Sequence, residues 1–237
     1  MSGTIVSEFK SLISERILPS NLICETVMLA LGALWKITMI RDQQVRANRK
    51  VIEPLMASHI LDLVRSMLNV SIEQLSETPE DVQDKEDLAQ RITAPFRRIL
   101  PAIRISSKWL RSNYGFVETA LSSAASTDSL MHSLKTFWEA YATFFTTLNA
   151  TFPREKLPEL TGPLEEDVCM SGFTPIKKVI LHPVSSTENG LSPGQNLVHP
   201  NEEYLMRLSD LLKDFHLLKD AEVRNLYIIV DVCLTCF

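Results

Sequence analysis

Glycine and cysteine are scarce in this chain, and the two shortages exclude several classes of protein. The seven glycines among 237 residues are scattered singly, so no glycine-rich loop of the kind that cradles phosphates is present. Four cysteines are too few for a disulfide scaffold in a chain of this length. Cys233 and Cys236 form one Cys-x-x-Cys pair, which is weak evidence for zinc without a second pair or nearby histidines. We therefore expect reduced intracellular thiols, no metal and no cofactor.

Long apolar segments without charges are also missing. The first twenty residues carry charged side chains within their apolar pattern, unlike a signal peptide. The longest apolar run near the end, residues 226–237, contains Asp231 and is too short to span a bilayer. The net charge of −5 argues against a surface that binds polyphosphate everywhere, although a local basic face is compatible with it. These features predict a protein that is soluble in the nucleus, the cytoplasm or both.

The pattern that the chain does have is that of amphipathic helices, with apolar residues three and four apart. This spacing predicts helices over residues 4–18, 21–40, a stretch after Pro54, about 85–112, 130–148 and 201–220. The segment 21–40 is apolar on several faces, so we expect it to be central and largely buried. Pro95 and Pro101 lie within the 85–112 segment, which predicts a break or kink near either.

Prolines divide the chain into three regions. Residues 1–149 are predicted to form a helical bundle, and residues 150–200, with seven of the twelve prolines, an irregular connector. Residues 201–237 are predicted to form a C-terminal helix and an apolar tail. The expected fold is all-α, with antiparallel helical hairpins stacked in a TPR-like or α-solenoid-like manner beside a long proline-rich connector. An apolar tail without a partner in the chain is a liability, so we expect this end to be truncated or altered.

The strongest electrostatic feature is a run of five cations without an intervening acid: Arg97, Arg98, Arg104, Lys108 and Arg111. On a helix the last three return to nearly the same azimuth as Arg97, which predicts a cationic ridge. Such a ridge can neutralise several phosphates of RNA or DNA in a salt-dependent way. Trp109 and Tyr114 offer stacking surfaces, although Trp109 fits a core position equally well. The alternative is a solvated basic face that is paired with the acidic segment 73–87.

A second informative stretch is residues 164–176, which read Leu-Glu-Glu-Asp-Val-Cys-Met-Ser-Gly-Phe-Thr-Pro-Ile. Pro175 biases the preceding residue toward extended geometry, so we expect no helix through this point. Gly172 permits a tight bend that presents Phe173. Phe173 then either plugs a groove between the long helices, which we favour, or faces outward as an anchor for a partner. The stretch therefore predicts an irregular connector with an aromatic anchor.

The three acids of this stretch, Glu165, Glu166 and Asp167, raise the question of a metal or acid–base site. Adjacent acids point in different directions, and no histidine at ligand spacing accompanies them. We expect a structural role instead, in which Glu166 or Asp167 caps a helix or receives an arginine. No catalytic residue is predicted, and we expect that the protein is not an enzyme.

The stretch resembles the Leu-Pro-Glu-Asp-x-x-Leu-Arg-Gly-Phe-x-Pro-Leu motif of a eukaryotic family. That family comprises the ever-shorter-telomeres telomerase-associated proteins and the SMG proteins of nonsense-mediated mRNA decay. The matching residues are Leu164, Glu166, Asp167, Gly172, Phe173 and Pro175. Glu165 replaces the family proline and Ser171 replaces its arginine, which removes the one cation of the motif. The helix around Trp138, Tyr141 and Phe145 and the run Asn201-Glu-Glu-Tyr-Leu extend the resemblance over most of residues 20–220.

The resemblance implies a helical DNA/RNA-binding domain that acts as an adaptor in nonsense-mediated mRNA decay, in telomerase regulation, or in both. One hypothesis is that the cationic ridge binds single-stranded RNA or telomeric DNA. The other is a protein-interaction scaffold in a decay or telomerase complex, with no direct contact to nucleic acid. Family members carry an N-terminal 14-3-3-like helical-repeat region for which there is little room here, so we expect the start to be truncated too. The sequence leaves open the ligand, the partners and the oligomeric state.

Overall fold

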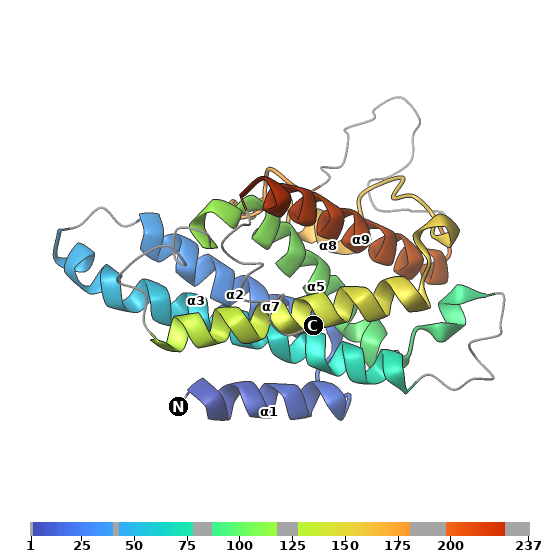
Figure 1. Ribbon diagram of the computed structural model, residues 1–237, viewed down its shortest axis with the longest axis horizontal. Coiled ribbons are helices and arrows are strands. Elements are labelled where there is room, and N and C mark those ends of the chain that lie inside the picture. Colours follow the sequence, from blue (N-terminus) through green and yellow to red (C-terminus); the bar gives the residue numbers. More distant parts are fainter. Residues whose placement is uncertain (1, 40–42, 78–86, 118–127, 181–197, 226–237) are drawn as a thin grey trace.

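The computed structural model is a bundle of helices (Figure 1), and it describes residues 2–39, 43–77, 87–117, 128–180 and 198–225. Its elements are α1 (Ser2–Ser14), α2 (Ser20–Met39), α3 (Gln43–Ser76), η1 (Leu88–Arg91), α5 (Ala94–Ser112), α7 (Asp128–Thr151), η2 (Arg154–Lys156), α8 (Glu165–Cys169) and α9 (Pro200–Asn225). Within these ranges there is no β-strand, so the predicted all-α class is confirmed. The apolar tail at 226–237 and most of the predicted acidic loop lie outside the described residues.

Helix α5 occupies the centre of the bundle, where it packs against α1, α2, α3 and α9. Every residue from Pro95 to Leu110 is buried except Arg97 and Arg98. The Thr93 side chain caps the start of the helix, because its hydroxyl oxygen accepts the Phe96 N–H at 3.4 Å. Pro95 sits in the first turn, where a missing N–H costs no helical hydrogen bond. The polar side chains of α5 therefore meet other helices rather than water.

Prolines affect the predicted helices in different ways. The predicted break is present near Pro95, since η1 ends at Arg91 and α5 begins at Ala94. Pro101, however, lies inside α5, and Pro54 lies inside α3, which begins at Gln43. A proline removes one backbone donor from a helix. Most helical stability in a folded protein comes from packing, and both helices continue past their prolines.

Helix α2 is not the central helix that its composition predicts. Only one face is buried, formed by Ile23, Val27, Leu31 and Leu34. On the other side Leu29 is 75% exposed, and Leu22 and Met39 are exposed as well. By length and composition α2 is the one helix in the described parts of the chain that is able to cross a membrane. This is weak evidence for a span, because core helices and signal sequences share these properties.

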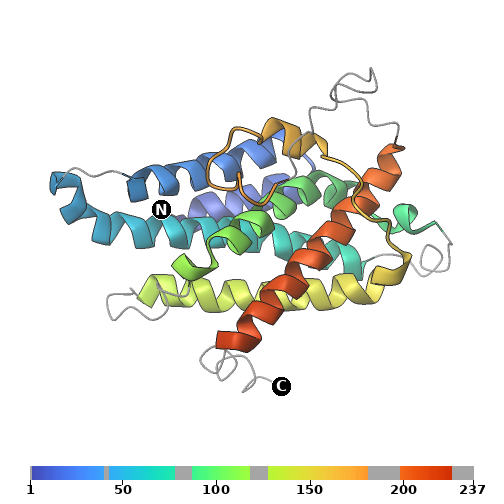
Figure 2. The same ribbon diagram turned by 90° about the horizontal axis from the view of Figure 1, so that it is seen from above.

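Contacts between helices that are far apart in the sequence determine how the bundle is arranged. Helix α7 lies along α3 (Figures 1 and 2), and a buried hydrogen bond of 2.7 Å joins the Ser58 and Ser133 hydroxyls. Helix α9 packs on α5. In the contacts between them the residue numbers increase along both helices, from Arg97–Asn201 through Arg104–Asp210 to Arg111–Asp214. These two helices therefore run parallel and do not form a hairpin. The predicted solenoid-like stack of hairpins stays a prediction.

Aromatic side chains join α7 to α9. Phe144 and Phe145 of α7 are fully buried. The Phe145 ring stacks on Phe215 of α9, with 4.5 Å between centroids and 8° between planes, and Tyr141 lies beside both. Ring pairs of this kind contribute about 0.5–1.5 kcal/mol beyond the burial of their area. They hold α9 over the bundle and so keep its polar face on α5.

Phe173 rests on α2, in agreement with the favoured prediction that it plugs a groove. It is partly buried against the hydrophobic core. A Cβ atom added to Gly32 of α2 would lie 3.5 Å from Cε2 of Phe173, so the ring lies directly over this glycine. Gly172 has neither a left-handed backbone nor a close neighbour. The predicted tight bend is present, because the Phe173 N–H donates to the Met170 carbonyl at 2.8 Å, but its backbone does not require glycine. The glycine that Phe173 contacts is Gly32.

Substitutions at Gly32 test this contact. We expect Gly32→Ala to leave the free energy of unfolding unchanged or raise it by up to about 1 kcal/mol, because alanine is the better helix former. Gly32→Leu should displace the Phe173 ring and lower the free energy by about 1–3 kcal/mol. Urea denaturation measures both variants. Equal stability of Gly32→Leu and the unmodified chain would show that Phe173 does not rest on this position.

Candidate functional site

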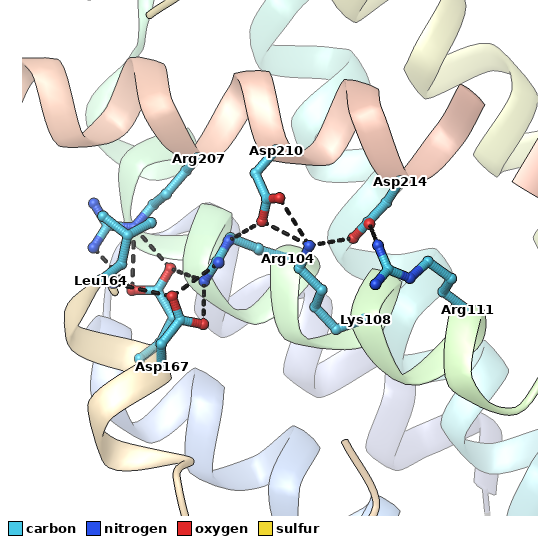
Figure 3. A network of polar contacts seen from close by, with 9 residues as sticks. Arg104, Lys108, Arg111, Leu164, Asp167, Arg207, Asp210 and Asp214 are labelled. Atoms are coloured by element: carbon cyan, nitrogen blue, oxygen red, sulfur yellow. Dashed lines mark hydrogen bonds and ion pairs between the residues drawn. The ribbon is translucent and has the colours of Figure 1, made fainter. Parts of the chain in front are cut away.

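Four cations and four carboxylates form one buried network between α5, α8 and α9 (Figure 3), which we call the ionic ladder. Helix α5 contributes Arg104, Lys108 and Arg111, α8 contributes Glu166 and Asp167, and α9 contributes Arg207, Asp210 and Asp214. The formal charges of these eight side chains cancel. The helix positions are three or four residues apart on α5 and on α9, so each helix turns one polar edge toward the other.

Arg104 is the centre of the ladder and is only 1% exposed. Its Nε donates to Asp210 at 2.6 Å, and its Nη1 and Nη2 donate to the two oxygens of Asp167 at 2.8 and 2.9 Å. Nη1 also donates to Glu166 at 3.1 Å. All three guanidinium nitrogens are thus occupied by carboxylates, and the two-bond contact with Asp167 is the strong geometry for this pair.

The other contacts of the ladder extend from Arg104 in both directions. Toward the C-terminal end of α5, Lys108 Nζ lies 2.8 Å from Asp210 and 2.9 Å from Asp214. Arg111 Nη1 follows at 2.6 Å from Asp214. On the other side, Arg207 Nη2 lies 2.9 Å from Glu166. Each carboxylate therefore contacts at least one cation, which is the condition for keeping charges inside a protein.

Helix α8 places its two acids by local chemistry. The Asp167 carboxylate accepts the backbone N–H of Leu164 at 3.0 Å, which closes the start of the helix. Leu164, Met170 and Ile176 are buried and anchor the segment on the bundle. The prediction that Glu166 or Asp167 caps a helix or receives an arginine agrees with these contacts. The prediction of a wholly irregular connector is wrong, because the acidic half forms a short helix.

Burial and ion pairing act on the ladder in opposite directions. Burial alone raises the pKa of Glu166, but the hydrogen bonds and charge of Arg207, with the charge of Arg104, bring that pKa below its ordinary value. Burial also opposes the charge on Asp210, and Arg104 and Lys108 lower its pKa overall. For Arg104 burial disfavours the cation, yet Asp210, Glu166 and Asp167 raise its pKa above the ordinary range. These three groups of the ladder are therefore ionised at neutral pH.

The predicted open ridge is wrong, although its geometry on the helix is right. Arg104, Lys108 and Arg111 share one face of α5, but α9 covers that face, and Lys108 is only 4% exposed. Their acidic partners come from α8 and α9, not from the 73–87 segment. The spacing of charges fixes their azimuth on a helix. It does not say which element covers them.

The two remaining ridge residues have separate local roles. Arg97 donates to the carbonyls of Ile92 and Ala89 at 2.9 and 2.8 Å and lies over the Tyr204 ring. Arg98 donates to the backbone carbonyl of Arg16. Trp109, predicted as a stacking surface or a core residue, is 6% exposed and belongs to the core. The five cations thus do not form one continuous exposed row.

Arg207, Asp210 and Asp214 are the functional residues that the apolar pattern of α9 did not predict. Their spacing of three and four residues was nevertheless available as a signal, because it places one cation and two acids on one edge of a helix. The same spacing separates Arg104, Lys108 and Arg111. Complementary charges at matching intervals on two helices would have indicated the pairing.

Neither metal binding nor thiol chemistry gains support from the described residues. Among the described residues, no cluster of three or more His, Cys, Asp or Glu side chains is arranged to hold a metal. Burial, followed by the charge of Glu166, raises the pKa of the Cys24 thiol to about 12. Cys24 is therefore a protonated thiol at neutral pH and a poor nucleophile.

These features define a helical domain whose Glu-Asp…Gly-Phe-x-Pro segment is clamped by buried ion pairs. The family model described as Est1 DNA/RNA binding domain matches residues 1–179 of the 237. The chain belongs to this family, which confirms the resemblance drawn from residues 164–176. The matched region includes α5 and α8 and ends before α9, so three members of the ionic ladder lie outside it. Comparison with curated proteins and with solved structures finds no match.

The Asp210→Asn substitution tests the ladder. The amide keeps the shape of the side chain but leaves Arg104 Nε and Lys108 without part of their counter-charge. We expect a loss of about 3–5 kcal/mol in the free energy of unfolding, as for other broken buried pairs. Glu202→Gln, on the exposed side of the same helix, is the control and should change stability by less than about 0.5 kcal/mol. Equal effects of the two substitutions would contradict a structural role for the ladder.

The ladder also predicts how stability depends on pH. Glu166 and Asp210 have folded-state pKa values below their ordinary values of 4.5 and 3.8. Their contribution is therefore fully present above those ordinary values and is lost as the pH falls through the lower folded-state values. We expect the melting temperature to fall steeply below about pH 4. The fall should be shallower for Asp210→Asn, and identical pH profiles of the two proteins would contradict the assignment.

Proposed function

We propose that this chain is a non-enzymatic, nucleic-acid-associated domain with a telomerase-related role. The observation that carries the proposal is the match of the Est1 DNA/RNA binding domain to residues 1–179. The fold supports it, because the ionic ladder and the aromatic contacts produce a rigid helical body on which surface cations keep fixed positions. The finer role is that of an adaptor in telomerase regulation, in nonsense-mediated mRNA decay, or in both, acting in the nucleus, the cytoplasm or both.

The contact surface we propose differs from the predicted ridge. Arg154 and Lys156 in η2 and Lys177 and Lys178 after the motif are all exposed and all lie within the matched residues. Glu155 and Val179, which adjoin these two groups in sequence, line the same cleft, so the groups lie near one another. We call these four side chains the connector cations. Four exposed cations from two neighbouring segments are suited to a phosphate backbone.

A protein-interaction scaffold is the second candidate, and α2 is the observation that favours it. Its outer side exposes Leu22, Leu29 and Met39, with Leu29 the most exposed at 75%. Apolar side chains gathered on one helix are typical of surfaces that bind other proteins. In this alternative the domain joins a decay or telomerase complex without touching nucleic acid.

Fluorescence anisotropy with single-stranded RNA and single-stranded DNA separates the two candidates. We expect binding of the unmodified chain at about 50 mM salt and a steep loss of affinity at about 200 mM. The double variant Lys177→Glu/Lys178→Glu should bind at least about tenfold more weakly, with a salt slope smaller by about two. The double variant Lys36→Glu/Lys135→Glu, at exposed sites on α2 and α7, is the charge-matched control. No binding to either strand at low salt would leave only the scaffold.

A further inference from the structure

A cleft of about 690 Å3 opens where the C-terminal part of α5, helix α9 and the start of the connector meet. Its helical wall contains Lys108, Arg111, Ser209, Asp210 and Lys213, and its other wall contains Arg154, Glu155, Leu157, Glu159, Leu160 and Val179. The volume lies within the range of roughly 300–1,000 Å3 that is common for ligand sites. The cleft adjoins the Arg111 end of the ionic ladder but is a separate space.

Three cations from three elements border this cleft and retain hydrogen-bond donors. Arg111 uses Nη1 for Asp214, and among the described residues neither its Nε nor its Nη2 has a partner. Its side chain is 29% exposed. Arg154 and Lys213 are exposed, and no ion pair with a described residue occupies them. The Asp210 carboxylate, in contrast, is already bound by Arg104 and Lys108. Arg111 and Lys213 therefore give the helical wall donors for an anionic group, and Arg154 adds a donor on the opposite wall.

The connector wall has a different character. Leu157 and Leu160 give it an apolar surface, to which Val179 adds, while Glu155 and Glu159 are exposed carboxylates on the same side. Among the described residues that line the cleft none is aromatic, so these residues offer bases no ring on which to stack. The two carboxylates also repel phosphates. A nucleic acid would thus use only part of this lining.

The backbone of the connector wall is open as well. Leu157 ends η2 in an extended conformation, with φ −93° and ψ 139°. Residues 159–161 follow without regular structure, and their backbone groups make no hydrogen bond with described residues. An unpaired backbone beside a cleft can accept an extended peptide, as the open edge of a sheet does.

We propose that this cleft binds an extended segment of a partner protein in which acidic and large apolar side chains alternate. Alternate side chains of an extended peptide point to opposite sides, which suits two walls of different character. The acids meet Arg111 and Lys213, the apolar side chains meet Leu157 and Leu160, and the peptide backbone pairs with residues 159–161. This inference goes beyond the proposed nucleic-acid function and does not depend on it.

The test uses all 237 residues and a fluorescein-labelled peptide of about ten residues in which Asp and Leu alternate, so that its side chains point alternately to the two walls. In an anisotropy titration we expect saturable binding that Lys213→Glu weakens by about tenfold or more, the scale of one lost charge contact. Glu159→Gln should tighten binding, because it removes a like charge. The Lys135→Glu variant should bind as the unmodified chain does. Circular dichroism confirms that each variant is folded.

Replacing the leucines of the peptide by serine, with every Asp retained, should weaken binding by about tenfold, because the apolar contacts are lost. Failure of the original peptide to bind would overturn the proposal, and so would equal weakening by Lys213→Glu and Lys135→Glu. A third result would also contradict the proposal: single-stranded oligouridine displaces the peptide, and Lys213→Glu lowers the affinity for oligouridine more than it lowers the affinity for the peptide. The cleft would then be a nucleic-acid site. Failure of the chain to bind RNA or DNA would refute the proposed function and leave this inference unaffected.

Discussion

The structure depends on the need to neutralise Arg104 inside the bundle. A guanidinium at 1% exposure loses its hydration, and only well-placed carboxylates can offset that cost. Asp167, Glu166 and Asp210 supply them from two other elements, so one side chain of α5 fixes where α8 and α9 must lie. The other cations of the ladder are likewise paired with carboxylates of α8 and α9. A buried network of this kind contributes more to the choice of one arrangement than to net stability, which we take as a hypothesis for this fold.

The ladder also gives the family motif a physical explanation. Its two matching acids are not a reactive pair, because they form the point at which the connector is fastened to α5 and α9. Phe173 makes a second attachment on Gly32 of α2. The connector is thereby held at two places, one within α8 and one just after it, and the exposed residues that follow, such as Lys177, take defined positions on the surface.

Local rules predicted much of this fold, and long-range packing accounts for what they missed. Apolar spacing identified α7 and α9, and the chemistry of adjacent acids indicated the structural role of Glu166 and Asp167. The same rules placed Arg104 and Lys108 on one face of α5 but could not show that α9 covers it, because that contact joins residues about a hundred positions apart. They also placed a helix start after Pro54, which lies inside α3, and mistook the composition of α2 for a central position.

The parallel packing of α5 and α9 has a consequence for how the chain folds. Arg104 finds Asp167 63 residues later in the sequence and Asp210 106 residues later. During synthesis the charges of the central helix must therefore stay hydrated until α9 has been made. Contacts between such distant residues stabilise the chain only after a long loop has closed, and the entropy lost in closing that loop slows folding. The middle of this bundle is thus completed only after α9, the last of the described helices, has been made.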